Sequence, residues 1–76
     1  MSSKAYILIT VDTATTQQVV KRLEAVPAVI AVHEVLGPYD IIAEVEAPTH
    51  EDLVAALRHQ IRSIKGIVNT VTCTWL

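Results

Sequence analysis

The sequence has few of the residues that define several large classes of protein. A single cysteine, Cys73, excludes an internal disulfide and a cysteine-rich zinc site, which fits a reducing compartment. Two glycines, three prolines and no low-complexity run exclude collagenous and disordered chains. No apolar run approaches the roughly 18 residues that span a bilayer, and the N-terminus lacks an apolar signal core. We therefore expect a cytoplasmic protein without membrane contact.

The chain also lacks a surplus of positive charge. Six Lys and Arg stand against eight Asp and Glu, a formal net charge of −2, so little is available to neutralise a phosphate backbone. A length of 76 residues leaves room for one domain, since domains usually reach about 100 residues or more. The expectation is a single domain over residues 1–76 that does not bind DNA or RNA directly.

What the sequence does have is β-branched residues, because Val, Ile and Thr supply 27 of its 76 positions. Apolar periodicity predicts strands over 5–11, 29–36, 41–46 and 68–75. It predicts a first helix over 14–25, which Asp12 or Thr13 caps and Pro27 ends. A second helix begins at a Thr49 cap and ends at Gly66. The inner stripes of the two helices are expected at Val19, Leu23 and Val26, and at Leu53, Leu57, Ile61 and Ile64.

The resulting order is β-α-β-β-α-β, and its halves repeat at an offset of 34, with Ile7 matching Ile41 and Leu23 matching Leu57. Two βαβ-type units of this kind predict an α+β fold of the ferredoxin-like arrangement. In it, a four-stranded antiparallel sheet carries two helices on one face.

The second face of that sheet is the unusual feature. Tyr6 and Leu8 alternate with Ile7 and Ile9, so the first strand is apolar on both faces although two helices cover only one. Two copies that pack sheet against sheet would cover it, which predicts a homodimer of the dimeric α/β barrel type. The alternative is a second face wetted by Glu34, Glu44 and the threonines of the last strand.

No catalytic or metal-binding constellation is visible, so no metal or cofactor is expected. His33, His50 and His59 stand apart in the sequence without a metal-ligand spacing. Glu44 and Glu46 alternate on one strand, where solvated charges or interface ion pairs are a more common role than paired acid and base. The Cys73 side chain is expected to be a small buried thiol.

The segment Gly37-Pro38-Tyr39-Asp40 has two interpretations. It has the composition of a hairpin turn. It also combines loop N–H groups for a carboxylate with an Asp40 carboxylate for an ammonium, which are the two charged groups of an α-amino acid. Thr70 and Thr72 would add hydroxyls on one side of the last strand, or are there only as good strand formers.

Three segments, residues 26–34, 37–45 and 66–72, resemble the effector-binding (RAM) domain of the Lrp/AsnC transcriptional regulators. The resemblance covers essentially the whole chain. It implies a ferredoxin-like fold, dimers with facing sheets, octamer- or decamer-like rings, and amino-acid effectors bound between dimers. Gly37, Tyr39 and Asp40 match the effector-loop motif, and Thr70 and Thr72 match the last-strand pair. Pro38 departs from the motif and removes one N–H from the loop.

Full-length members of that family carry an N-terminal helix-turn-helix domain, whereas this sequence begins at the first strand. The resemblance therefore implies a stand-alone ligand-binding and oligomerisation module that is not an enzyme, has no DNA-binding domain and co-assembles with full-length regulators. A small monooxygenase or isomerase is one alternative, because ferredoxin-like dimers also host those enzymes, and a pure assembly scaffold is another.

Overall fold

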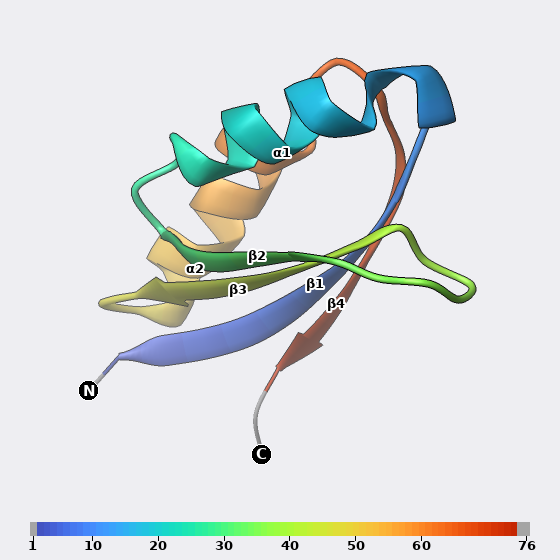
Figure 1. The fold of residues 1–76 in the computed structure, drawn as a ribbon. Helices are drawn as coiled ribbons and strands as arrows, with labels where there is room; N and C mark the ends of the chain where they lie inside the picture. Colours follow the sequence, from blue (N-terminus) through green and yellow to red (C-terminus); the bar gives the residue numbers. More distant parts are fainter. Residues whose placement is uncertain (1, 75–76) are drawn as a thin grey trace.

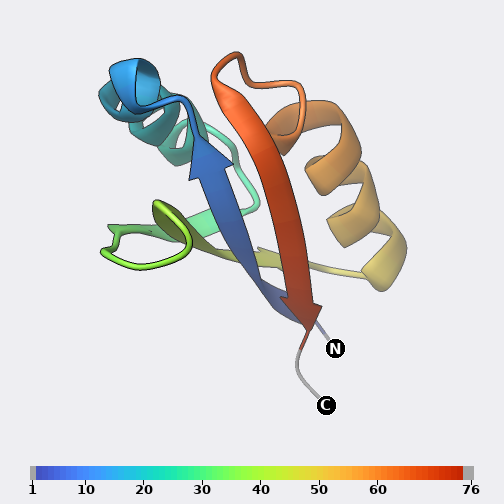
Figure 2. The same ribbon diagram turned by 90° about the vertical axis from the view of Figure 1, so that its right-hand side faces the viewer.

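The computed structural model describes residues 2–74 and confirms the ferredoxin-like arrangement (Figure 1). Its strands are β1 (Ser3–Val11), β2 (Val29–Glu34), β3 (Ile41–Ala47) and β4 (Ile67–Thr74). The helices are α1 (Thr16–Glu24), preceded by the short turn η1 (Thr13–Thr15), and α2 (His50–Ala56), continued by η2 (Leu57–Ile61). The strands pair antiparallel in the order β2-β3-β1-β4, and both helices lie on the same side of the sheet (Figures 1 and 2). The sheet is open, with β2 and β4 as its edges, so the single chain does not form a closed barrel.

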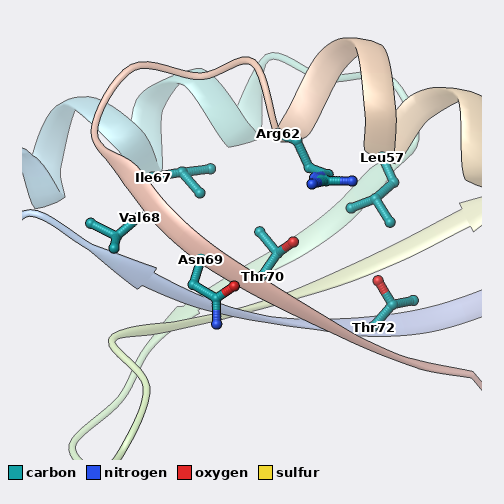
Figure 3. Close-up of a pocket in the computed structure, with 7 residues that line it drawn as sticks. All are labelled: Leu57, Arg62, Ile67, Val68, Asn69, Thr70 and Thr72. Atoms are coloured by element: carbon teal, nitrogen blue, oxygen red, sulfur yellow. The ribbon is translucent and has the colours of Figure 1, made fainter.

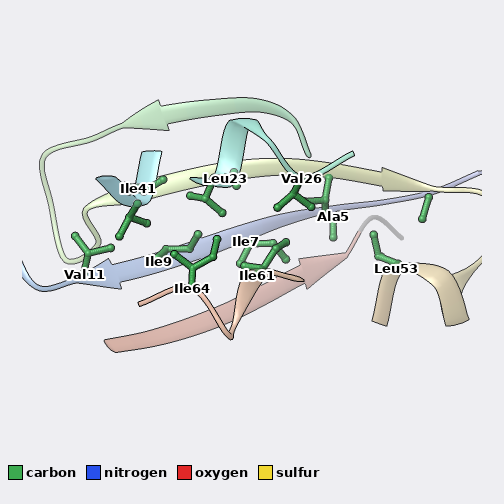
Figure 4. Packing of buried hydrophobic residues seen from close by; sticks show 14 residues of the cluster. Ala5, Ile7, Ile9, Val11, Leu23, Val26, Ile41, Leu53, Ile61 and Ile64 are labelled. Carbon is green, nitrogen blue, oxygen red and sulfur yellow. The ribbon is translucent and has the colours of Figure 1, made fainter. Parts of the chain in front are cut away.

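The core fills the space between the sheet and the two helices (Figure 4). The predicted inner stripes are confirmed, except that Leu57 is only partly buried. Among the described residues the largest fully buried side chains are Ile7, Ile9, Leu23, Ile41, Ile61, Val19 and Val45. Alternate residues of β1 and β3 thus supply one layer of the core and the helices supply the other.

The predicted caps begin the turn η1 before α1 and the helix α2. The Asp12 carboxylate accepts a hydrogen bond from the Ala14 N–H, and the Thr49 hydroxyl accepts one from the Asp52 N–H at 3.1 Å. Each bond satisfies an N–H that has no partner inside its helix. The chain from 14 to 25 is less regular than predicted, because its first residues form a 3-10 turn before α1 begins.

Strand β2 differs from the predicted strand over 29–36 in length and in facing. It ends at Glu34, and a bulge lies between Val29 and Ala31, which pair with the adjacent residues Val45 and Glu44. The extra residue, Ile30, is 56% exposed. The alternation of the sequence would place Ile30 and Val32 on one face, but a bulge shifts it by one, so Val32 packs against the core and Ile30 does not.

The end of the second helix is not the regular helix predicted to run to Gly66. The Arg62 N–H donates to the Leu57 carbonyl at 2.9 Å, five residues back, so the segment is a π-turn. The helical segment ends at Ile61, earlier than predicted, and Gly66 lies in the turn before β4 with a φ of +104°. The predicted strand over 68–75 is found one residue earlier, and Trp75 lies outside the described residues.

Candidate functional site

The open face of the sheet is the side that no helix of the chain covers. Strand register places Leu8 opposite Ile42 and Val71, and Tyr6 opposite Glu44 and Cys73. Tyr6 is 41% exposed and Val71 is 37% exposed. The open face is therefore apolar at Leu8, Ile42 and Val71, and it also carries the polar side chains of Glu44 and His33.

The polar residues of the alternative interpretation lie mostly on the other side. Glu34 pairs with buried Ile41, and its carboxylate accepts a hydrogen bond from the Gln17 amide of the helical layer at 3.5 Å. Thr70 and Thr72 pair with the buried Ile9 and Ile7 of β1. Of the groups expected to wet the second face, only Glu44 lies there.

Cys73 corrects a further expectation, because its thiol is exposed on the open face and not buried. The cause is the facing of β4, whose alternate residues point away from the helices. Within residues 2–74, no helix has the length and apolar character needed to cross a bilayer.

The acidic and histidine side chains do not form a catalytic or metal-binding cluster. Glu44 pairs with His33 Nε2 at 3.0 Å on the open face, while Glu46 accepts a hydrogen bond from the Ser2 hydroxyl at 2.6 Å. The two glutamates therefore have separate partners. No group of three or more His, Cys, Asp or Glu residues with metal-binding geometry exists in the described part of the chain.

The loop between β2 and β3 holds Asp40 against strand β1. The Asp40 N–H donates to the Ile9 carbonyl at 2.9 Å, and the carboxylate oxygen Oδ2 accepts from the Val11 N–H at 2.9 Å. The Val35 N–H closes the loop by donating to the Asp40 carbonyl at 3.0 Å. Both interpretations of this segment thus keep support: it is a hairpin turn, and the second carboxylate oxygen of Asp40 stays available.

Asp40 borders a hollow together with Thr16, Glu34, Val35 and Leu36, and among residues 2–74 no cationic side chain lines it. Gly37 stands at the exposed tip of the loop with a φ of +155° and with nothing within 4 Å of the position of a Cβ. Tyr39 is half-buried beside Asp40. The loop therefore presents negative charge and the free N–H groups of Gly37 and Tyr39.

Thr70 and Thr72 lie in a different place, a groove of about 330 Å³ between β4 and the end of the second helix (Figure 3). Its lining is formed by Leu57, Arg62, Ile67, Val68, Asn69, Thr70 and Thr72. In Figure 3, the Thr70 and Thr72 side chains point toward the helix and Arg62 extends from the helix toward Thr70, whereas Asn69 points away. The groove is thus hydroxyl-lined and positively charged.

Within one chain, the structure brings Thr70 and Thr72 together but does not join them to Gly37, Tyr39 and Asp40. Asp40 and the two threonines border separate hollows, on opposite sides of β1. Arg62 is the charged residue among the groove residues that the sequence did not identify as site residues. In the sequence, Arg62 is one of three cations near a helix C-terminus, with Arg58 and Lys65. The π-turn that positions Arg62 could not be predicted from the spacing of the apolar residues.

Comparison with known proteins gives one family. The model of the Lrp/AsnC ligand-binding domain matches residues 4–76. An uncharacterized HTH-type transcriptional regulator of Pyrococcus furiosus is 32% identical over 75 residues, which are 95% of this chain and 50% of that protein. The chain spans about half the length of the curated regulators that it matches. A homocitrate synthase of Sulfurisphaera tokodaii is 39% identical over 57 residues, 75% of this chain but 12% of the enzyme.

Solved structures agree with this result. A hypothetical protein of Pyrococcus horikoshii superposes with a TM-score of 0.91 at 32% identity, covering 100% of this chain and 90% of that one. E. coli AsnC has the same fold, with a TM-score of 0.92 at 23% identity over 97% of this chain and 50% of its own. The chain belongs to the Lrp/AsnC ligand-binding domain family and is a module related to transcriptional regulators of that type.

Proposed function

We propose that the chain is a non-enzymatic module that binds an amino acid between copies of itself and thereby changes its assembly. The observation that carries the proposal is the separation of the two groups that match the family's motif. Asp40 with the Gly37 and Tyr39 N–H groups lies on one surface, and Thr70 with Thr72 lies on another. A site that uses both groups needs the loop of one copy against the groove of a second copy.

Two observations support a small zwitterionic ligand. The loop hollow is lined by acidic side chains without a cation, and the groove is lined by Arg62 without an acid, so together they complement an ammonium and a carboxylate. A transcriptional regulator of Neisseria meningitidis with the same fold, TM-score 0.88 and 12% identity, was solved as its complex with L-Met. A ligand that binds the assembled form better than the separate copies shifts the equilibrium by that difference in affinity.

The test is calorimetric titration of the chain with each of the twenty amino acids, with Asp40→Asn as the informative variant. Asn keeps an oxygen that accepts the Val11 N–H but lacks the charge, whereas Asp40→Ala would also leave that N–H without a partner. We expect Asp40→Asn to weaken ligand binding roughly 10-fold or more while the melting temperature changes little. The absence of binding by all twenty amino acids to the wild-type chain would contradict the proposal.

The open face provides the first level of assembly. We propose that two copies pack these faces together, since the apolar residues Leu8, Ile42 and Val71 then leave water. Octamer- or decamer-like rings would follow from the loop-to-groove contact between such dimers. Mixed assemblies with full-length relatives would link ligand binding to DNA.

Val71→Asp is expected to convert the assembly to monomers at micromolar concentration, because it places an unpaired charge next to Leu8, among the apolar residues that the paired faces would bury. The dimer should weaken roughly 100-fold or more. Gln60→Glu adds the same charge to the exposed helical layer and should leave the mass in solution unchanged. Light scattering measures both variants, and a monomeric wild-type chain would refute the face-to-face dimer.

The match to homocitrate synthase involves a small part of that enzyme, and it fits a ligand-binding role better than a catalytic one. It covers only 12% of that enzyme, and the described residues of this chain contain no group of His, Cys, Asp and Glu side chains that could hold a metal ion. A domain of this kind attached to an enzyme could bind a small ligand with the same site that we propose for this chain. A stable assembly that binds no amino acid would instead support a role as an assembly scaffold.

A further inference from the structure

The groove between β4 and the helical layer contains polar groups that the chain itself leaves without partners. Within residues 2–74, the side chains of Arg62, Thr70 and Thr72 take part in no hydrogen bond or ion pair. No acidic side chain lines the groove. A guanidinium and two hydroxyls therefore face the same space with their hydrogen-bonding capacity unused, in a volume of about 330 Å³ that suits a small ligand.

The position of Arg62 results from an irregularity of the helix. An α-helix would turn by about 100° for each residue, and the five-residue hydrogen bond from the Arg62 N–H to the Leu57 carbonyl replaces the normal four-residue step. The turn still buries Ile61 and Ile64, so the core is kept while Arg62 reaches over β4 (Figure 3). Single π-turns of this kind are frequent at functional sites.

We propose that Arg62 binds the carboxylate of the ligand, with the Thr70 and Thr72 hydroxyls as additional donors. This inference rests on the proposed function, in which Asp40 binds the ammonium of the ligand, and it assigns the carboxylate to the groove. The loop is a poorer carboxylate partner, because its free N–H groups at Gly37 and Tyr39 lie next to the acidic side chains of Glu34 and Asp40, which repel a carboxylate. A guanidinium offers two parallel N–H donors that match the two oxygens of a carboxylate.

The assignment predicts which ligands are accepted. The free carboxylate becomes a requirement, so an amino acid should bind and its α-carboxamide should not. The side chain of the ligand is left to contact the apolar part of the lining, Leu57 and Ile67. The groove thus selects small carboxylic acids with an apolar or uncharged remainder, and the Asp40 loop of a neighbouring copy selects those that also carry an ammonium.

The experiment compares wild type, Arg62→Gln, Arg62→Lys and Arg58→Gln by calorimetric titration. The probes are the twenty amino acids and then the α-carboxamide of the tightest binder. Arg58 is the matched control, because it is an exposed arginine of the same helical segment that does not line the groove. We expect Arg62→Gln to weaken binding roughly 10- to 100-fold, Arg62→Lys to restore only part of it, and Arg58→Gln to bind as wild type. The melting temperatures of all four proteins should agree within a few degrees.

The outcomes separate this inference from the function on which it rests. Wild-type affinity in Arg62→Gln, together with weakened binding in Asp40→Asn, would overturn the role of Arg62 and leave amino-acid binding intact. Equal binding of the amino acid and its carboxamide would overturn the role of the carboxylate. If the wild-type chain binds none of the twenty amino acids, the proposed function and the assignment of Arg62 both fail.

Discussion

Replacing Gly66 with alanine is expected to lower the free energy of unfolding by about 3 kcal/mol or more. Gly66 has a φ of +104°, in a region that residues with a Cβ rarely adopt. An added Cβ would also overlap the Thr15 hydroxyl and lie 3.0 Å from Val19 Cγ2. The Gly66 carbonyl accepts a hydrogen bond from the Asp12 N–H at 2.9 Å, so the backbone cannot move away without losing that bond. Chemical denaturation monitored by circular dichroism measures the change.

Gly37→Ala is the matched control for this effect. Gly37 also has a positive φ, but no atom lies within 4 Å of its Cβ position. Its replacement should lower the free energy of unfolding by about 1 kcal/mol, which is the cost of the backbone conformation alone. Equal losses of stability in the two variants would show that the close approach of Gly66 to η1 and α1 is unimportant.

Ile7→Ala is the second substitution with a large expected effect, a loss of about 2–5 kcal/mol. Ile7 is 1% exposed and lies in the middle of β1, paired with Ala43 on one side and Thr72 on the other. Both neighbours are small, so they cannot fill the space that the missing carbons leave. Domains of this size have little stability to spare, and we expect the variant to be largely unfolded above room temperature.

Leu36→Ala removes a comparable amount of apolar side chain from a site without packing. Leu36 is 103% exposed at the tip of the β2–β3 loop, so the change in the free energy of unfolding should stay within about 0.5 kcal/mol. A thermal melt of both variants checks the contrast. A stable Ile7→Ala chain would mean that the helices can close over the gap.

The fold could be predicted from the sequence because each element carried its own signal. Alternating Ile residues predicted β1, and the Asp12 and Thr49 caps predicted where the two helical segments begin, whereas the second segment ends at Ile61, before the predicted Gly66. The bulge at Ile30 was missed because a run of Val, Ile and Ala is apolar in either register. The π-turn was missed for a similar reason, since Leu57 and Ile61 have the spacing of an ordinary helix.

The candidate site was predictable only in part. The residues Asp40, Thr70 and Thr72 stood out by their motifs, but sequence alone did not tell that β1 separates the loop from the threonines. The internal hydrogen bond of Asp40 to the Val11 N–H depends on a contact between residues 29 positions apart, which no local pattern encodes. Arg62 was hidden among other helix cations, because its role depends on where the groove lies and not on its neighbours in the chain.

The π-turn adds one residue to the second helix. A π-turn holds one residue more than the α-helical turn that it replaces. Deleting a single residue from the exposed stretch 58–60 would therefore restore a regular helical turn and leave Ile61 and Ile64 facing the core. Inserting a residue there would instead rotate everything after it by about 100° and take Ile61 and Ile64 out of the core. This exposed stretch should thus tolerate substitution and the loss of one residue, but not an insertion.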